Sequence, residues 1–211
     1  RAVAGDLLVI DIGGATTDVY SVIHPPSPQQ REELPAPLNM RPVLEPLAAA
    51  RTVEGDLGVR WNARAIIEAA DAEALGPITT ALREYAGRVQ SQPAYLPFGA
   101  AETGHDVELA RLAVLVAVRR HGRPVLPNES PRALGTVAHL IGSGGVLRHT
   151  GERGRTSILD AVVADHAGGW PVPYAAQTHV DTAYLLFAAG LVARHDEDLA
   201  RSIAVQVLET H

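Results

Sequence analysis

The amino-acid sequence predicts an α/β fold, a mixed sheet flanked by helices, from two observations. Apolar runs typical of strands buried on both faces occur at residues 7–11 (LLVID) and 136–141 (TVAHLI). Segments with the helical spacing of apolar residues lie between these runs and after the second one. Strands towards both ends of the chain, with helices between them, are typical of this fold class.

The first strand is expected to continue into a hairpin. Gly13 and Gly14 mark a tight turn, and residues 16–23 (TTDVYSVI) are rich in the β-branched and aromatic side chains that strands favour. Residues 24–46 concentrate prolines, which predicts an extended and irregular excursion. Another strand and a turn are expected within residues 50–59.

The middle of the chain predicts helices. Residues 60–72 and 78–89 have helical spacing, and residues 102–121 form the longest helical candidate because their apolar side chains fall on one face. Residues 124–131 contain prolines and are expected to form a loop.

The C-terminal part begins with the second apolar strand. That strand is expected to end at a glycine-rich turn, residues 142–145 (GSGG). Helices are expected at residues 157–164, 180–194 and 196–208, and the last of these begins with acidic residues that suit a helix N-terminus.

Composition excludes several classes of protein. All 18 basic residues are arginine, so a P-loop, which requires lysine at the phosphates, is impossible. The absence of cysteine excludes disulfides and thiolate metal sites. A net charge of −6 without a basic run argues against nucleic acid or an anionic membrane as a partner. We expect a cytoplasmic fragment of a longer protein, because the chain starts with Arg1 and has no visible signal peptide or apolar run long enough to span a bilayer.

The segment 11–18 (DIGGATTD) is suited to binding a phosphate. Gly13 and Gly14 allow a sharp turn, with φ > 0 accessible, and leave their N–H groups unobstructed. Successive exposed N–H groups attract an anion, and the hydroxyls of Thr16 and Thr17 could add donors to phosphate oxygens.

Two acids flank this turn. Asp11 ends the first strand and Asp18 follows the turn, so the two carboxylates could hold Mg²⁺, which prefers a few carboxylates together with retained waters. The competing interpretation is a plain Gly-Gly hairpin in which the acid and the threonines only satisfy the backbone.

The second glycine-rich segment, residues 142–145, follows a buried strand. Its small residues would let a flat ring or a ribose lie directly on the backbone, although a plain strand-to-helix loop is the alternative. The glycine spacing does not match a Rossmann motif, and Ser143 lacks the G-x-S-x-G context of a nucleophile.

Other candidate residues are better explained by structure. The nine histidines include no H-x-x-x-H pair, so scattered surface or core positions are expected. Trp61 and Trp170 are expected to anchor the core or a subdomain interface, and Arg119 and Arg120 suit the C-terminal dipole of a helix.

Together, the hairpin and the GSGG turn resemble the second phosphate motif and the adenosine motif of the actin-like ATPase superfamily. The turn in RTVEGDLGVRWNA is similar to one that heat-shock chaperones place before their helical subdomain, and residues 181–190 resemble the connecting helix of that fold. The strings DIGGATTDVYSV, RTVEGDLGVRWNA and IGSGGVL together resemble MutL-type proteins, also called GlmL, which accompany glutamate mutase and are unrelated to the mismatch-repair protein of the same short name.

This resemblance implies the second lobe of an actin-like (ribonuclease H-like) ATPase. Residues 1–59 and 122–211 would form the nucleotide-binding subdomain, and residues 60–121 a helical insert subdomain. The first phosphate hairpin of the superfamily belongs to an upstream lobe and is missing from this chain. The isolated half should therefore bind nucleotide weakly and be inactive alone, because phosphoryl transfer needs groups from both sides.

The resemblance also implies an ATP-binding accessory protein that reactivates an adenosylcobalamin-dependent mutase, with ATP, Mg²⁺, the mutase subunit and the missing N-terminal lobe as partners. Asp11 would orient Mg²⁺ or water, and Arg111 could form the adenine wall. The residues around the β- and γ-phosphates would be Gly13, Gly14, Ala15, Thr16 and Thr17. Those beneath the adenosine would be Gly142, Ser143, Gly144 and Gly145.

Two alternatives within the same fold stay open. One is an ATP-dependent amidohydrolase of the hydantoinase/oxoprolinase type, whose phosphate hairpin is similar but which is expected to have a longer chain and another C-terminal glycine motif. The other is a sugar or acid kinase, for which the sequence offers no obvious catalytic base.

Overall fold

The structure, a computed structural model, describes residues 5–24, 48–124 and 129–209. The proline-rich excursion expected after the hairpin lies almost wholly outside these residues, as does the centre of the 124–131 loop. No helix in the described ranges is long and apolar enough to cross a membrane.

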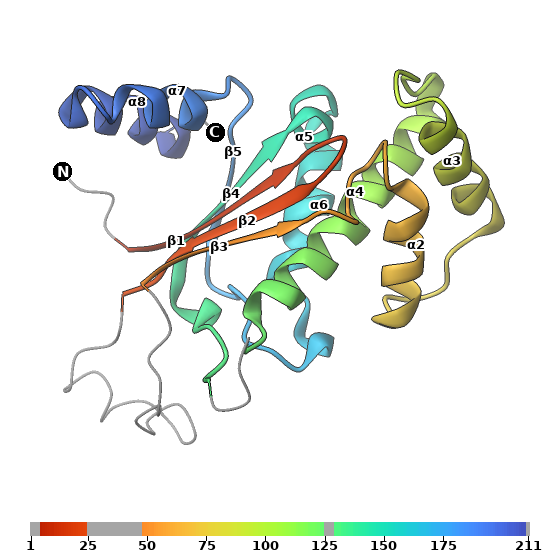
Figure 1. Ribbon diagram of the computed structural model, residues 1–211, viewed down its shortest axis with the longest axis horizontal. Coiled ribbons are helices and arrows are strands. Elements are labelled where there is room, and N and C mark those ends of the chain that lie inside the picture. Colours follow the sequence, from red (N-terminus) through yellow and green to blue (C-terminus); the bar gives the residue numbers. More distant parts are fainter. Residues whose placement is uncertain (1–4, 25–47, 125–128, 210–211) are drawn as a thin grey trace.

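Five strands form one mixed sheet in the order β3-β2-β1-β4-β5 (Figure 1). The first three are antiparallel neighbours, and β4 and β5 run parallel to β1. The predicted α/β class and mixed sheet are therefore confirmed. The strands are β1 (Asp6–Ile12), β2 (Thr17–Val22), β3 (Ala49–Glu54), β4 (Val137–Gly144) and β5 (Gln177–Val180).

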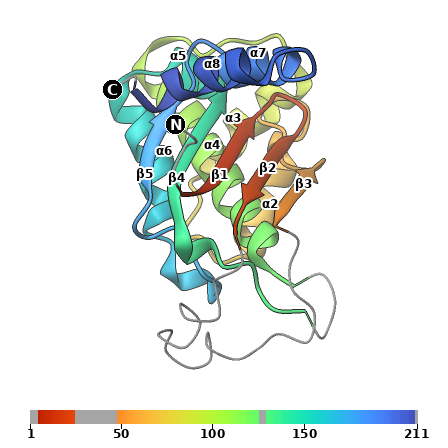
Figure 2. The same ribbon diagram turned by 90° about the vertical axis from the view of Figure 1, so that its left-hand side faces the viewer.

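Helices cover the sheet unequally. In Figures 1 and 2, α4 and α6 lie against one face, whereas α7 and α8 lie on the other side of the sheet, at the upper left of Figure 1. Two short 3₁₀ turns, Leu134–Thr136 and His166–Gly168, complete the elements. The helices are α2 (Ala63–Ala72), α3 (Thr80–Ser91), α4 (Gly99–Gly122), α5 (Gly145–His149), α6 (Glu152–Val163), α7 (Leu185–Val192) and α8 (Glu197–Glu209).

The longest helix, α4, is the centre of the core. Its C-terminal half is buried almost all round, because it contacts strands β1 to β3 as well as helices α2, α3 and α6. The apolar face expected from the sequence is fully buried: Leu109, Leu112, Ala113, Val116 and Ala117. One hydrophobic cluster joins the sheet to the helices of residues 60–121, and the division of the chain into two subdomains stays a prediction.

The structure corrects three boundaries in the C-terminal part. β4 continues through the expected turn and ends at Gly144, and α6 begins at Glu152, five residues before the expected start. Residues 180–194 were expected to be one helix, but they begin with the end of β5, and α7 covers only Leu185–Val192.

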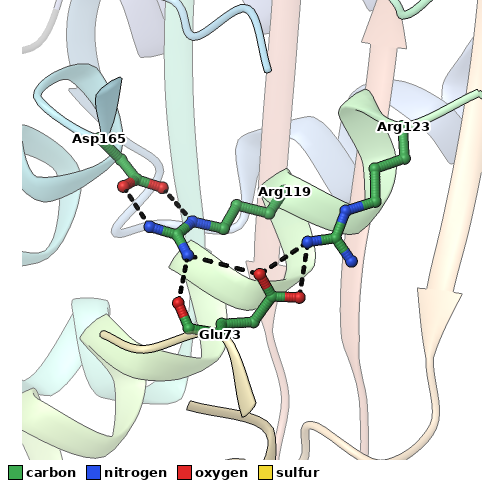
Figure 3. Close-up of polar contacts among 4 residues, drawn as sticks. All are labelled: Glu73, Arg119, Arg123 and Asp165. Carbon is green, nitrogen blue, oxygen red and sulfur yellow. Dashed lines mark hydrogen bonds and ion pairs between the residues drawn. The ribbon is translucent and has the colours of Figure 1, made fainter. Parts of the chain in front are cut away.

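An ion-pair network fixes the C-terminal end of α4 (Figure 3). The guanidinium of Arg119 binds both carboxylate oxygens of Asp165 at 2.7 Å and the carbonyl oxygen of Glu73 at 2.7 Å. Arg123 donates to both carboxylate oxygens of the same Glu73, at 2.7 and 2.6 Å. The helix dipole alone was expected to explain Arg119, but specific partners just after α2 and α6 hold its buried side chain.

Candidate functional site

The two glycine-rich motifs lie side by side. β1 and β4 are parallel neighbours, and their register places Asp11 beside Ser143 and Ile12 beside Gly144. The hairpin and the GSGG segment therefore meet at the same edge of the sheet, where ligands commonly bind in α/β proteins. The structure thus brings together residues that are far apart in the sequence.

The carbonyl groups of the hairpin are anchored by the turn that precedes α2. The N–H of Val59 donates to the Gly13 oxygen at 3.2 Å, and the N–H groups of Arg60 and Trp61 donate to the Gly14 oxygen at 2.9 Å. These bonds hold the tip of the hairpin against residues 55–62.

The third carbonyl of the tip is held by a side chain. Asn62 donates its amide Nδ2 to the Ala15 oxygen at 2.9 Å and to the Gly55 oxygen at 2.8 Å. Gly58 makes this close approach possible, because a Cβ at that position would lie 2.2 Å from the Ala15 carbonyl carbon. The turn was expected from the sequence, but its function as an anchor was not.

Anchoring the carbonyls also orients the amides. In a trans peptide the C=O and the following N–H point in opposite directions, so the N–H groups of Gly14, Ala15 and Thr16 point away from the anchoring turn. These three N–H groups have no hydrogen-bond partner in the described part of the chain, and Gly14 and Ala15 are exposed. Successive free amides of this kind can bind an anion.

The reason for the two hairpin glycines differs from the expected one. Neither has a positive φ; among the described residues, the glycines that do are Gly5, Gly76, Gly99, Gly144 and Gly169. Gly13 is required because a Cβ would lie 2.8 Å from the Thr16 oxygen, which accepts the Gly13 N–H at 2.9 Å. A Cβ on Gly14 would make only ordinary contacts with the Arg60 side chain.

The two threonines of the motif are not equivalent. Thr17 is fully buried, and its hydroxyl donates to the Leu57 carbonyl at 2.7 Å, so it ties the hairpin to the anchoring turn. In this arrangement the Leu57 carbonyl occupies the Thr17 hydroxyl, and a contact between Thr17 and a phosphate oxygen stays a prediction. Thr16 stands at the tip, where its hydroxyl donates to Asp18 at 3.2 Å.

Asp11 and Asp18 face each other across the β1–β2 pair. Arg51 donates to Asp18 at 3.0 Å and stacks over the Tyr20 ring, so Asp18 is already engaged. Although Asp11 is exposed at the surface, desolvation by the surrounding chain raises the pKa of its carboxyl above the ordinary value, and the charges of Asp18 and Asp181 raise it further. Asp11 is thus the carboxylate at this edge whose charge is poorly compensated.

Asp181 is a component of the site that the sequence did not assign to it. It is buried just after β5, and its N–H donates to the Gly142 oxygen at 2.9 Å. Its carboxylate accepts the N–H groups of Leu185 and Leu186 at 2.8 and 2.9 Å, which caps α7. The resemblance places this acid as the first residue of a connecting helix, whereas α7 begins four residues later at Leu185. An acid at the end of a strand, as at Asp11, was the available signal.

The carboxylates at this edge do not form a complete metal cage. In the described ranges, no group of three or more His, Cys, Asp or Glu side chains is arranged to hold a metal ion. Asp11 and Asp18 remain a two-carboxylate arrangement, which is the kind that Mg²⁺ uses together with water and phosphate oxygens.

The four residues of the GSGG segment have different environments. A Cβ on Gly142 would lie 2.5 Å from Leu147, so this glycine lets α5 pack on the strand. Ser143 is buried, and Gly144 has φ +109°. Gly145 is exposed with open space around it.

Arg111 and Trp61 lie in environments that the sequence did not indicate. The guanidinium of Arg111 binds Glu108, one turn away on α4, at 2.6 and 2.7 Å, and its place beside an adenine stays a prediction. Trp61 is 62% exposed and is therefore not a core residue. Near the GSGG segment, Arg148 instead lies 4.9 Å from the centre of the Tyr184 ring, and Tyr184 has φ +54°.

Comparison with known proteins gives two matches. A family model described as MutL protein matches residues 1–208. The chain is also similar to "Protein MutL" of Clostridium tetanomorphum, with 32% identity over 220 residues that cover 97% of this chain and 45% of that protein. The chain thus spans about half the length of this curated relative. No solved structure matches the chain significantly.

Proposed function

Because the chain belongs to the MutL family, we propose that it forms the second lobe of an actin-like, ATP-binding accessory protein. The observation that carries this proposal is the row of three free N–H groups of Gly14, Ala15 and Thr16. They are oriented by anchored carbonyls and lie at the edge that the GSGG segment shares.

The residues present fit a polyphosphate. Three amides at consecutive positions can donate to phosphate oxygens without side-chain rearrangement, since the backbone is already held by residues 55–62. The hydroxyl of Thr16 could join them, because its present partner Asp18 also accepts from Arg51. Thr17 would stabilise the hairpin through its hydrogen bond to the Leu57 carbonyl and would not contact the nucleotide.

We assign the Mg²⁺-facing carboxylate to Asp11. Its raised pKa shows that its negative charge is disfavoured where it stands, and a cation would relieve that cost. Bound Mg²⁺ would supply positive charge that offsets the phosphates. Asp18 would act from the neighbouring strand, through water, while Arg51 keeps it in place.

The adenosine is assigned to the backbone of residues 142–145. The exposed Gly145 leaves room beside the strand end, whereas Arg111 would first have to leave Glu108. Gly144, with φ +109°, turns the chain from β4 into α5 and packs against Ile12, so it shapes the backbone on which the adenosine would lie.

The biological role that we propose is reactivation of an adenosylcobalamin-dependent mutase of the glutamate mutase type. ATP would be held between this lobe and a second lobe elsewhere in the longer protein. Groups from both lobes would then be needed for tight binding and turnover.

Titration calorimetry tests the two-lobe arrangement. Mg-ATP should bind the full-length protein much more tightly than it binds this 211-residue chain alone. Equal affinities would contradict a nucleotide held from both sides.

Hydrolysis tests the assignment of Asp11. Asp11→Ala in the full-length protein should abolish ATP turnover and leave the fold intact, whereas Asp160→Ala, at an exposed position on α6, should have no effect. Survival of turnover in Asp11→Ala would show that another carboxylate faces Mg²⁺.

Capture of the mutase subunit in the presence of ATP tests the partner. If the mutase does not bind and the full-length protein instead hydrolyses a hydantoin or 5-oxoproline with ATP, the amidohydrolase interpretation replaces the accessory role.

A further inference from the structure

Asp106, in the N-terminal half of α4, joins three segments of the chain. Its carboxylate accepts two hydrogen bonds from the Arg60 guanidinium, at 2.9 and 2.5 Å. It also accepts the hydroxyl of Tyr85 on α3 at 2.7 Å. The side chains of Arg60 and Asp106 are only 13% and 8% exposed. This buried, bidentate pair therefore fixes both side chains in one geometry.

Arg60 is also part of the hairpin anchor. Its N–H donates to the Gly14 oxygen at 2.9 Å, and its Cβ and Cγ lie alongside Gly14. The Gly14 carbonyl and the Ala15 N–H belong to one peptide plane. A displacement of the Arg60 backbone would therefore also move the amide at the centre of the proposed phosphate site.

We propose that Asp106 is a positioning residue that couples helices α3 and α4 to the phosphate hairpin. Tyr85 and Asp106 hold the guanidinium of Arg60, and the backbone N–H of Arg60 in turn holds the Gly14–Ala15 peptide. A partner that shifts α3 or α4 changes the affinity of the hairpin for phosphate, and bound phosphate biases these helices in return. The proposal rests on the function proposed above for the hairpin.

The test uses Asp106→Asn in the full-length protein. Mg-ATP affinity is measured by calorimetry, and exchange of the Arg60 and Trp61 amides, which donate to Gly14, is measured by NMR without nucleotide. We expect the Kd to rise about tenfold, within the usual range of coupling between sites, and both amides to exchange faster. Tyr85→Phe, which removes only a hydroxyl, should shift both quantities in the same direction by less.

Two controls separate positioning from stability. Asp71→Asn breaks the exposed Arg83–Asp71 pair in the same helical segment and should change neither quantity. Val116→Ala removes core volume from α4 and should lower the unfolding temperature while leaving the Kd unchanged.

Unchanged Kd or unchanged exchange in Asp106→Asn overturns the proposal, as does an equal rise in Kd in Val116→Ala. If Asp106→Asn does not fold, Tyr85→Phe decides by the same two criteria. If the unmodified protein does not bind Mg-ATP, the proposed function fails, and the exchange measurement still shows whether Asp106 controls the hairpin anchor.

Discussion

Gly144 on β4 approaches Ile12 on β1 so closely that a Cβ on Gly144 would lie 2.2 Å from the Ile12 carbonyl oxygen. Gly144 also has φ +109°, which L side chains rarely adopt. Gly144→Ala should therefore lower the free energy of unfolding by about 3 kcal/mol. Gly145→Ala, where a Cβ meets nothing within 4 Å, should leave the free energy of unfolding nearly unchanged. Urea titrations of both variants measure the difference. Similar losses in both would mean that the strand end can relax.

The anchoring turn gives a second pair of glycines with different expectations. A Cβ on Gly58 would lie 2.2 Å from the Ala15 carbonyl carbon, whereas a Cβ on Gly55 would meet nothing within 4 Å. Gly58→Ala should push the turn off the hairpin and destabilise the protein by about 2 kcal/mol or more. Gly55→Ala is the control. Thermal unfolding measures the stability, and the amide shifts of residues 13–16 report whether the hairpin moves; an unmoved hairpin would argue against the anchor.

The buried imidazole of His121 predicts loss of stability in acid. It contacts the hydroxyls of Ser21 and Thr52 at 2.8 and 3.0 Å, and burial, aided by the charge of Arg132, lowers its pKa to about 4. Because the unfolded chain takes up the proton near the ordinary value of 6.5, stability is lost as the pH falls from there towards 4. The loss should be on the order of 3 kcal/mol.

His121→Gln, which keeps polar atoms at this position, isolates this contribution. Urea titrations at several pH values should show a shallower decline for the variant than for the unmodified chain between pH 6.5 and 4. Parallel curves would assign the acid sensitivity to other groups.

Asp11 should be replaceable with a gain in stability. Its raised pKa means that folding disfavours the ionised carboxyl, so its contribution is favourable below the ordinary value of 3.8 and is lost as the pH rises through the folded value. Asp11→Asn should therefore raise the unfolding temperature at pH 7, and this gain should vanish at pH 3. ATP turnover should be lost in the same variant, which is the trade-off expected of a functional carboxylate.

Asp6 provides the opposite case. Burial works against its charge, but hydrogen bonds from the His24 N–H and the Thr136 hydroxyl, at 2.9 and 2.6 Å, outweigh burial and lower its pKa. Asp6→Asn should therefore destabilise the protein at pH 7. If Asp6→Asn and Asp11→Asn changed the unfolding temperature at pH 7 in the same direction and by the same amount, the electrostatic explanation would be contradicted.

Elements with strong local patterns could be predicted from the sequence. The run LLVID and the β-branched TTDVYSV gave β1 and β2, since a buried strand and its hairpin partner need little beyond neighbouring side chains. The four-residue β5 was missed because QTHV carries no apolar run. Gly142 and Gly144 suggested a turn, yet pairing with β1 keeps them in β4.

The candidate site could be predicted from the sequence only in part. The residues of the hairpin and of the GSGG segment could be identified because glycine, acid and hydroxyl types at that spacing suit phosphate chemistry. The contacts that orient them could not, since Asn62 reaches Ala15 across 47 positions and Arg60 reaches Asp106 across 46. No local pattern marks such contacts. The exposed Trp61 shows the converse, because residue type alone does not establish burial.

The ion-pair network at the end of α4 has a consequence for sequence variation in the family. Replacement of Glu73 would remove the carboxylate that binds Arg123 and that lies 3.4 Å from Arg119, although the backbone carbonyl of residue 73 would still accept from Arg119. Replacement of Asp165 would remove two hydrogen bonds from the guanidinium of the buried Arg119. A buried charge without its partner destabilises the fold far more than an intact ion-pair network, or apolar residues at all of these positions, would. Positions 73, 119, 123 and 165 should therefore covary among homologues, with single replacements rare and joint replacement by apolar residues tolerated.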